Sequence, residues 1–128
     1  MARAITDDIS VKVTPTFEGK QKGGFDGEYL FSYTVEIHNA GSDSVQLLSR
    51  HWYIFDSNAQ YSEVKGEGVI GEQPVIHPGN SHSYSSYCKL NTDMGLMWGT
   101  YLMKRMEDGK LFEVKIPEFQ LVVPYRQN

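Results

Sequence analysis

The chain has 128 residues, with 12 lysines and arginines against 16 aspartates and glutamates, so its formal net charge is −4. That length is typical of a single domain, 1–128, with one hydrophobic core. The acidic balance and the shortness of the basic clusters at 20–22 and 104–105 argue against nucleic acid as a partner. No apolar run approaches the ~18 residues of a membrane span. The N-terminus lacks the apolar stretch of a secretory signal, and a lone cysteine excludes an intramolecular disulfide. We therefore expect a cytoplasmic protein with no membrane partner.

Alternation of apolar and polar residues predicts strands in the first third of the chain. One is predicted at 9–17, and a glycine-rich flexible loop is expected after it at 18–27. A second strand is predicted at 29–38. Its apolar face consists of Tyr29, Phe31, Tyr33, Val35 and Ile37.

The strand predicted at 45–56 is apolar on both of its faces, so its orientation is ambiguous. We favour Leu48, Trp52 and Ile54 as inward residues, with the alternate aromatic residues on a partly covered outer face. A turn follows, and a short strand is predicted at 61–65 before a glycine-rich segment.

Three strands are predicted after that segment, the first at 81–88 and the second at 95–103. In the second, Gly99 shares the inward face, where its missing side chain could admit a bulky neighbour, and Trp98 points outward. An Asp-Gly pair then predicts a tight hairpin. In the last strand, 111–116, the inward parity changes after Pro117, which indicates a bulge or a crossing between sheets.

About seven strands with frequent turn residues, and no ten-residue stretch of helical spacing, predict an all-β fold. The expected architecture is an immunoglobulin-like or fibronectin type III-like antiparallel β-sandwich of about seven strands. The inter-sheet disulfide of antibody domains is absent, because the chain has one cysteine.

The segment 66–71 has the G-x-G-x-x-G spacing of dinucleotide-binding loops. Its glycines are Gly66, Gly68 and Gly71. Such a loop must open a helix whose N-terminus holds the phosphates. Pro74 and Pro78 forbid a helix of useful length here, and Glu67 and Glu72 place negative charge where a phosphate would lie. We therefore expect the glycines to serve a backbone turn between two strands.

Several motifs, spread over about residues 29–123, are specific enough to compare with known families. They are Ser49-Arg50-His51-Trp52, the block 64–74 that contains the three glycines, Pro78-Gly79, Met97-x-Gly99-x-Tyr101-x-Met103, and Phe112-x-Val114-x-Ile116-Pro117-x-Phe119-x-Leu121. Together they resemble the ApaG family. The resemblance implies a fibronectin type III-like sandwich. It also implies kinship with domains of an F-box protein and a polymerase-delta-interacting protein, where the module serves protein contacts. Bacterial members are associated with cobalt and magnesium homeostasis, and the resemblance carries over no catalytic residue.

One position departs from the pattern of that family. Trp98 stands between the methionine and the glycine of the Met-x-Gly-x-Tyr motif, where a polar residue is expected. An outward tryptophan is a candidate interface residue, because aromatic side chains dominate binding energy at interfaces. The alternative is that a neighbouring loop covers it.

Arg50 lies beside Trp52 in a predicted strand, so its charge has to reach water or a partner. We favour a structural interpretation, in which a salt bridge to Glu67, Glu72 or Asp56 holds the glycine segment against the sandwich. The functional interpretation is a contact with an anion or with the carboxylate of a partner.

Candidate catalytic and metal-binding residues are few. His51 and His77 could meet Glu67 or Glu72 in a weak divalent-cation patch, but scattered histidines do not make a zinc site. We predict no metal ligand, no cofactor and no catalytic residue. Cys88 is expected in the core rather than as a nucleophile, because free cysteines are among the most buried residues.

These observations favour a non-enzymatic module that binds a protein partner, with a homodimer as one form of that interaction. Strand edges and the glycine segment are the expected contact surfaces. The alternative is a small-ligand protein that binds a divalent cation or a pyrophosphate-containing metabolite at the same segment. The candidate residues for either function are Arg50, His51, Gly66, Glu67, Gly68, Gly71, Glu72 and Trp98.

Overall fold

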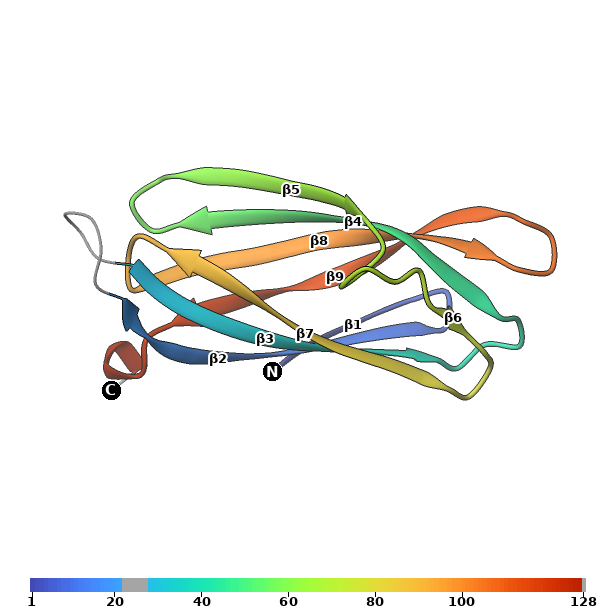
Figure 1. Cartoon of the computed structure of the whole chain (residues 1–128). Helices are drawn as coiled ribbons and strands as arrows, with labels where there is room; N and C mark the ends of the chain where they lie inside the picture. The colour runs from blue at the N-terminus through green and yellow to red at the C-terminus, as the bar shows by residue number, and fades with distance from the viewer. Residues whose placement is uncertain (22–27, 128) are drawn as a thin grey trace.

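The computed structural model describes residues 1–21 and 28–127, which fold into two antiparallel sheets stacked as a β-sandwich (Figure 1). The all-β prediction is confirmed. Within the described ranges, no helix has the length and apolar character needed to cross a membrane. The flexible loop predicted at 18–27 lies largely outside the described residues, at 22–27. Its beginning, 18–21, continues a strand instead, so that part of the prediction was wrong.

The described residues form nine strands, where about seven were expected. The first sheet has the order β1-β2-β3-β7, with β1 at Ala2–Thr6, β2 at Ile9–Gln21, β3 at Glu28–Asn39 and β7 at Ser81–Leu90. The second has the order β5-β4-β8-β9, with β4 at Val45–Asp56, β5 at Tyr61–Glu67, β8 at Met94–Arg105 and β9 at Leu111–Val122. The short β6, Val75–Ile76, also pairs with β4, and a 3-10 turn, Pro124–Gln127, follows β9. Every predicted strand lies within one of these, and the additions are β1 and the two-residue β6.

The core lies between the inner faces of the two sheets, where the predicted alternation places apolar residues. One assignment was wrong. Leu47 rather than Leu48 is buried, because the pairing of β4 with β8 jumps from Leu47–Met103 to Ser49–Leu102. Leu48 is therefore the extra residue of a β-bulge, which reverses the facing of the rest of the strand. Beyond it, the inward residues of β4 include Trp52, as predicted.

A second bulge lies in β9, at the predicted change of parity. The pairs jump from Met97–Phe119 to Gly99–Ile116, so two residues of β9 lie opposite Trp98 of β8. Pro117 is one of those two, which suits a residue that has no N–H to donate. The Asp-Gly hairpin between β8 and β9 also forms. It closes as a loop longer than a two-residue turn, since the N–H of Arg105 donates to the carbonyl of Lys110 at 2.8 Å.

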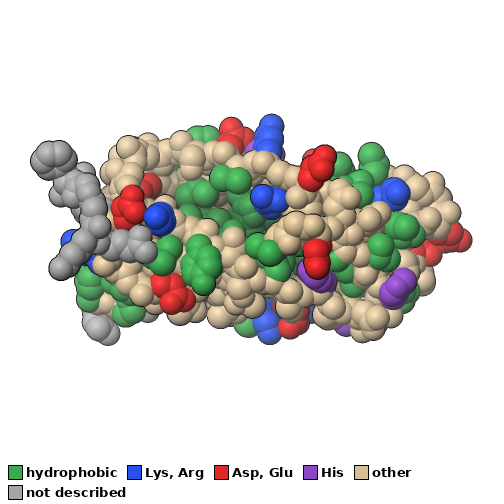
Figure 2. Space-filling view, viewed as in Figure 1, with side chains coloured by type: hydrophobic (Ala, Val, Ile, Leu, Met, Phe, Trp, Pro, Cys, Tyr) green, Lys and Arg blue, Asp and Glu red, His purple; other side chains and the backbone are tan. Residues whose placement is uncertain are grey.

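Strands β5 and β7 are edges of their sheets, because each has one neighbouring strand. Figure 1 shows them along the same side of the sandwich. In the same view, Figure 2 shows a hollow between them with hydrophobic side chains inside and Lys or Arg side chains at its border. The sandwich is thus open on the side where the predicted glycine segment lies.

Candidate functional site

The glycine segment, taken here as 66–74, begins in the last two residues of β5 and packs against β4 at its bulge. The N–H of Gly68 donates to the carbonyl of Leu48 at 2.8 Å, and the N–H of Leu47 donates to the carbonyl of Pro74 at 3.0 Å. The side-chain amide of Gln73 also donates to the Leu48 carbonyl, at 2.9 Å. The segment therefore satisfies backbone groups of β4 that lie between its pairs with β6 and its pairs with β5.

The tip of the segment is a two-residue turn. The N–H of Val69 donates to the carbonyl of Glu72 at 2.8 Å, and the N–H of Glu72 donates back at 3.0 Å. Between them, Ile70 and Gly71 have φ of 47° and 75°, as in a type I′ turn. Extended chain leads from Glu72 to β6, with no helix behind Gly71. The prediction of a backbone turn is confirmed.

Gly68 and Gly66 are required for different reasons. Gly68 has φ of 60°, and a Cβ there would lie 2.0 Å from the carbonyl oxygen of Glu72. Gly66 leaves room for a side chain, because its Cβ would lie 2.7 Å from the guanidinium carbon of Arg50. One glycine therefore serves the path of the backbone, and the other accommodates an arginine.

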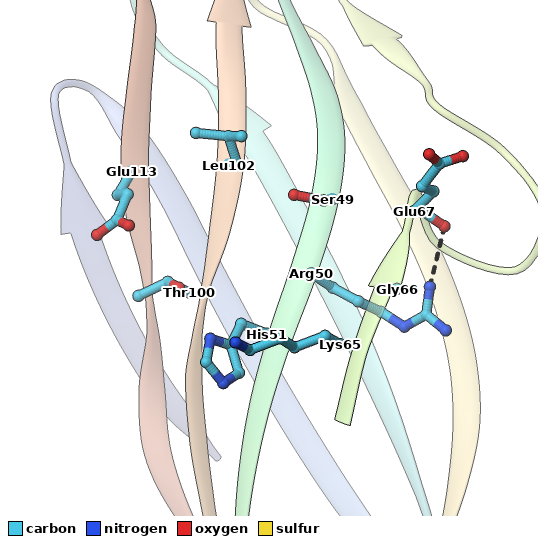
Figure 3. A pocket seen from close by; sticks show the side chains of 9 residues that line it. All are labelled: Ser49, Arg50, His51, Lys65, Gly66, Glu67, Thr100, Leu102 and Glu113. Carbon is cyan, nitrogen blue, oxygen red and sulfur yellow. Dashed lines mark hydrogen bonds between the residues drawn. The ribbon is translucent and has the colours of Figure 1, made fainter. Parts of the chain in front are cut away.

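Arg50 holds the segment in place, but through backbone oxygens rather than the predicted salt bridge. Its Nη1 donates to the carbonyl of Glu67 at 3.0 Å (Figure 3) and to that of Gly68 at 2.8 Å. The salt-bridge prediction was wrong because of strand parity. Arg50 points to the inner face, whereas Glu67, paired with Ser49, directs its carboxylate to the outer face.

The hydrogen bonds within the glycine segment argue against phosphate binding there. A phosphate loop needs free N–H groups that point at the ligand. Here the N–H groups of Gly68, Val69 and Glu72 already donate to carbonyls of the protein. The segment is thus a closed structural turn in which most of the candidate donors are used.

The cation patch considered from the sequence does not assemble. His51 Nε2 donates to Glu63 Oε1 at 2.7 Å on the outer face, while His77 Nδ1 lies 2.8 Å from Ser44 Oγ. Across residues 1–21 and 28–127, no three histidine, cysteine or acidic side chains gather where they could hold a metal ion. The two histidines belong to separate local contacts.

Trp98 points outward, as predicted, and it lies in a row of aromatic rings. Its ring stacks on Tyr53 at 5.7 Å between centroids, and Tyr53 in turn stacks on His51 at 4.3 Å. Tyr61 of β5 packs at 6.5 Å from Trp98. We call these four residues the outer aromatic row. Neighbouring rings partly cover Trp98.

A shallow groove runs beside this row over the outer face of the second sheet, with a volume of about 470 Å³. Figure 3 shows its lining from β4, β5, β8 and β9. The side chains include Ser49, His51, Lys65, Thr100, Leu102 and Glu113. Sequence reasoning missed Tyr53, Tyr61 and Glu63 as neighbours of the candidate residues. The strand register of β4 against β5 brings these residues together. No local sequence motif predicts that register.

Cys88 is buried, as predicted, and its thiol is a poor nucleophile. Burial, and secondarily the carboxylate of Asp56, raise the pKa of this thiol from 9.0 to about 11. At pH 8 the thiolate fraction is then about 100-fold below that of an ordinary cysteine. We expect iodoacetamide to modify the native protein at least 100-fold more slowly than the chain unfolded in guanidinium chloride.

The same shift fixes the sign of a pH effect. The folded state holds the Cys88 proton more tightly than the unfolded chain does, so the free energy of unfolding should fall as pH rises from about 9 to about 11. A Cys88→Ala variant should lack this part of the pH dependence. Rapid modification of the native thiol at pH 8 would contradict the burial argument.

Ile70 is a strained residue in an exposed position. It has φ of 47°, a region that β-branched residues disfavour, and 62% of its surface is exposed. Ile70→Gly is therefore expected to raise the free energy of unfolding by about 1 kcal/mol, since strain is relieved and little burial is lost. Urea denaturation measures the change. Ile70→Val, which keeps the branched Cβ, is the control and should give no gain.

Comparison with known proteins gives consistent relatives. A family model described as the ApaG domain matches residues 19–105. "Protein ApaG" of Methylobacterium sp. (strain 4-46) is 50% identical over 125 residues, covering 98% of this chain and 95% of the relative. The X-ray structure of a structural-genomics target superposes with a TM-score of 0.89 at 40% identity, covering 94% of this chain and 91% of that one. The crystal structure of a Bordetella pertussis protein described as ApaA has a TM-score of 0.85 at 44% identity, covering 91% and 94%.

Proposed function

This chain belongs to the ApaG family, and from that premise we propose that it is a non-enzymatic β-sandwich module that binds a protein partner in the cytoplasm. The observation that carries the proposal is the edge strand β5. Six of the seven residues of β5 are exposed to solvent, and the exposed fraction is 53% for Tyr61 and 42% for Val64. An edge strand with exposed apolar side chains is a surface to which another chain can add.

The outer aromatic row supports this surface from the adjacent strands. Tyr61 of β5 lies next to Tyr53 of β4 and Trp98 of β8, so aromatic rings extend from the edge toward the middle of the sheet. Tyrosine and tryptophan supply much of the binding energy at interfaces, since they bury large areas with few rotatable bonds. A partner that pairs with β5 and also extends over the outer face of the sheet would cover the row at the same time.

The alternative function, small-ligand binding at the glycine segment, receives less support. The amides of Gly68, Val69 and Glu72 are used within the protein, and the described residues bring no metal-ligand set together. Calorimetric titration with ADP, cobalt and magnesium should therefore show no binding tighter than about 100 μM. Tighter binding of any of the three would favour the alternative. If none of the three binds more tightly than that, the family link to cobalt and magnesium homeostasis would run through the partner rather than through a bound ion.

An affinity capture experiment tests the proposal. The full chain is immobilised, and a stoichiometric partner is sought in a lysate of a bacterium that carries this family. Trp98→Ala and Tyr61→Ser should each reduce recovery at least tenfold, because both remove rings of the proposed surface. Ile5→Ser is the matched control, since Ile5 is also exposed and apolar but lies on β1 of the other sheet.

Two outcomes decide between partner and homodimer. Sedimentation of the purified chain as a dimer that dissociates on Trp98→Ala would identify a second copy as the partner. Recovery of the same proteins by wild type and both variants, together with a monomer in sedimentation, would contradict a protein-binding role for this surface.

A further inference from the structure

A cleft opens between the edge strands β5 and β7 and leads into the core. Its volume is about 260 Å³, and Figure 2 shows hydrophobic side chains in the hollow at this place. The apolar part of the lining comes from Tyr33, Trp52, Ile54, Val64, Cys88 and Met97. Two cations, Arg50 and Lys89, also line it. A cleft that combines apolar side chains with a small number of placed polar groups is a usual form of binding site.

The guanidinium of Arg50 is fixed in position at one end of this cleft. Its Nη1 is fixed by the carbonyls of Glu67 and Gly68, and Gly66 provides the space in which the group lies. Among the described residues, Nη2 and Nε donate no hydrogen bond to the protein. A fixed guanidinium with a free pair of N–H donors matches a carboxylate, which it can bind in a bidentate manner.

The geometry of paired strands determines which residues of a strand added to β5 would point into the cleft. Residues opposite one another in neighbouring strands point to the same face of a sheet. Val64 and Gly66 of β5 are paired with the inward residues Trp52 and Arg50 of β4, so they face the cleft. A residue opposite Gly66 would meet no side chain from β5 and would lie over the Arg50 guanidinium. A residue opposite Val64 would point into the apolar part.

We propose that the partner presents an extended acidic segment that adds to β5 as an antiparallel strand. A glutamate or aspartate opposite Gly66 binds the free donors of Arg50, and an apolar side chain opposite Val64 enters the cleft. Read from its N-terminus, the segment has the order acidic residue, any residue, apolar residue. This inference rests on the proposed function and specifies the partner for it.

Charge complementarity favours an acidic segment over a neutral or basic one. The chain as a whole carries a formal net charge of −4, yet the charged side chains that line this cleft are Arg50 and Lys89. Lys89 also forms an exposed ion pair with Glu28 at 3.4 Å, beside the cleft rather than within it. A carboxylate is thus attracted to this edge locally, against the net repulsion of an acidic protein.

The test is a selection of random octapeptides displayed on phage against the full chain. Enriched peptides are synthesised, and their binding is measured by fluorescence anisotropy. We expect the acidic–any–apolar order among the enriched sequences. Replacing the acidic residue by its amide should weaken binding at least tenfold, since a charge-assisted bidentate contact is lost. Hydrogen exchange should show protection of the β5 amides when the peptide is bound.

Matched variants locate the binding site. Val64→Glu places a carboxylate in the cleft beside Arg50, at an exposed edge position that tolerates a charge, and should abolish binding. Lys65→Glu is the control, because it adds more negative charge on the opposite face of the same strand and should bind nearly as well as wild type. Arg50→Met should also abolish binding. If that variant fails to fold, Val64→Glu decides, with circular dichroism confirming its fold.

Three results would overturn this inference. They are failure of any peptide to be enriched, enrichment of peptides without an acidic residue, and equal binding by Val64→Glu and Lys65→Glu. In each of these cases, capture of a partner that is lost on Trp98→Ala would leave the proposed function standing. Loss of both the peptides and the captured partner would instead remove the proposed function itself.

Discussion

Gly99→Ala is expected to lower the free energy of unfolding by roughly 3–4 kcal/mol. A Cβ at this position would lie 2.1 Å from the carbonyl oxygen of His51 and 3.2 Å from the Cα of Trp52. Both atoms belong to the backbone of β4. No rotation of a side chain can therefore relieve the overlap.

The backbone at His51 is held on both sides, which makes the cost large. His51 pairs with Lys65 of β5 and with Thr100 of β8. A shift of β4 away from an alanine at position 99 would lengthen ladder hydrogen bonds with one strand or the other. Buried backbone groups left without partners are costly, so the strain cannot be moved elsewhere cheaply. The predicted loss is a large share of the roughly 5–15 kcal/mol that typically stabilises a domain.

Urea denaturation followed by the fluorescence of the two tryptophans measures this loss. Gly66→Ala is the matched control in the same sheet. Its Cβ would overlap the guanidinium of Arg50, a group at the end of a flexible side chain that can move away. We expect a cost of about 1–2 kcal/mol for the control, from the lost hydrogen bonds of Arg50. Equal losses in the two variants would show that β4 and β8 are not in close contact at Gly99.

Most strands of this protein were predictable because they carry a local pattern, whereas β1 and the two-residue β6 were not predicted. In β3, every second residue from Phe31 to Ile37 is buried, and this period of two can be read without knowledge of any neighbour. The change of parity after Pro117 was predictable for the same reason. The direction in which the side chain of Leu48 points was not predictable in this way. Its bulge exists only relative to Met103 of β8, more than fifty residues away in the chain.

The candidate site shows the same division between local and long-range information. The turn at Ile70 and Gly71 followed from glycine spacing and the flanking prolines, which act on the local backbone. The hydrogen-bond partners of Arg50 did not follow from the local sequence. A sequence shows which carboxylates lie nearby, but strand parity decides that Glu67 offers its backbone carbonyl instead of its side chain. Tyr61 reaches Trp98 in a similar way, through the register of three strands.

Gly68→Ala is expected to lower the free energy of unfolding by about 3 kcal/mol. The left-handed backbone at φ of 60° costs an alanine about 1 kcal/mol, and its Cβ would overlap the carbonyl oxygen of Glu72. That carbonyl accepts the N–H of Val69, whose side chain is buried in the core. The segment can escape the overlap by detaching, at the cost of about 1.5–3 kcal/mol of Val69 burial together with the hydrogen bonds that hold it to β4. Detachment therefore sets an upper limit on the loss.

Gly71→Ala separates the two causes, because Gly71 has a similar φ of 75° but open space around its Cβ position. We expect it to cost about 1 kcal/mol, from backbone conformation alone. Urea denaturation gives both values, and limited proteolysis should cleave the Gly68→Ala variant within 66–74 before the rest of the chain. Both effects should appear without any added ligand, since the glycines serve the turn. Equal stability losses in the two variants would contradict a structural role for Gly68. The same conclusion would follow if the Gly68→Ala variant were less stable than wild type only when both are measured with added nucleotide.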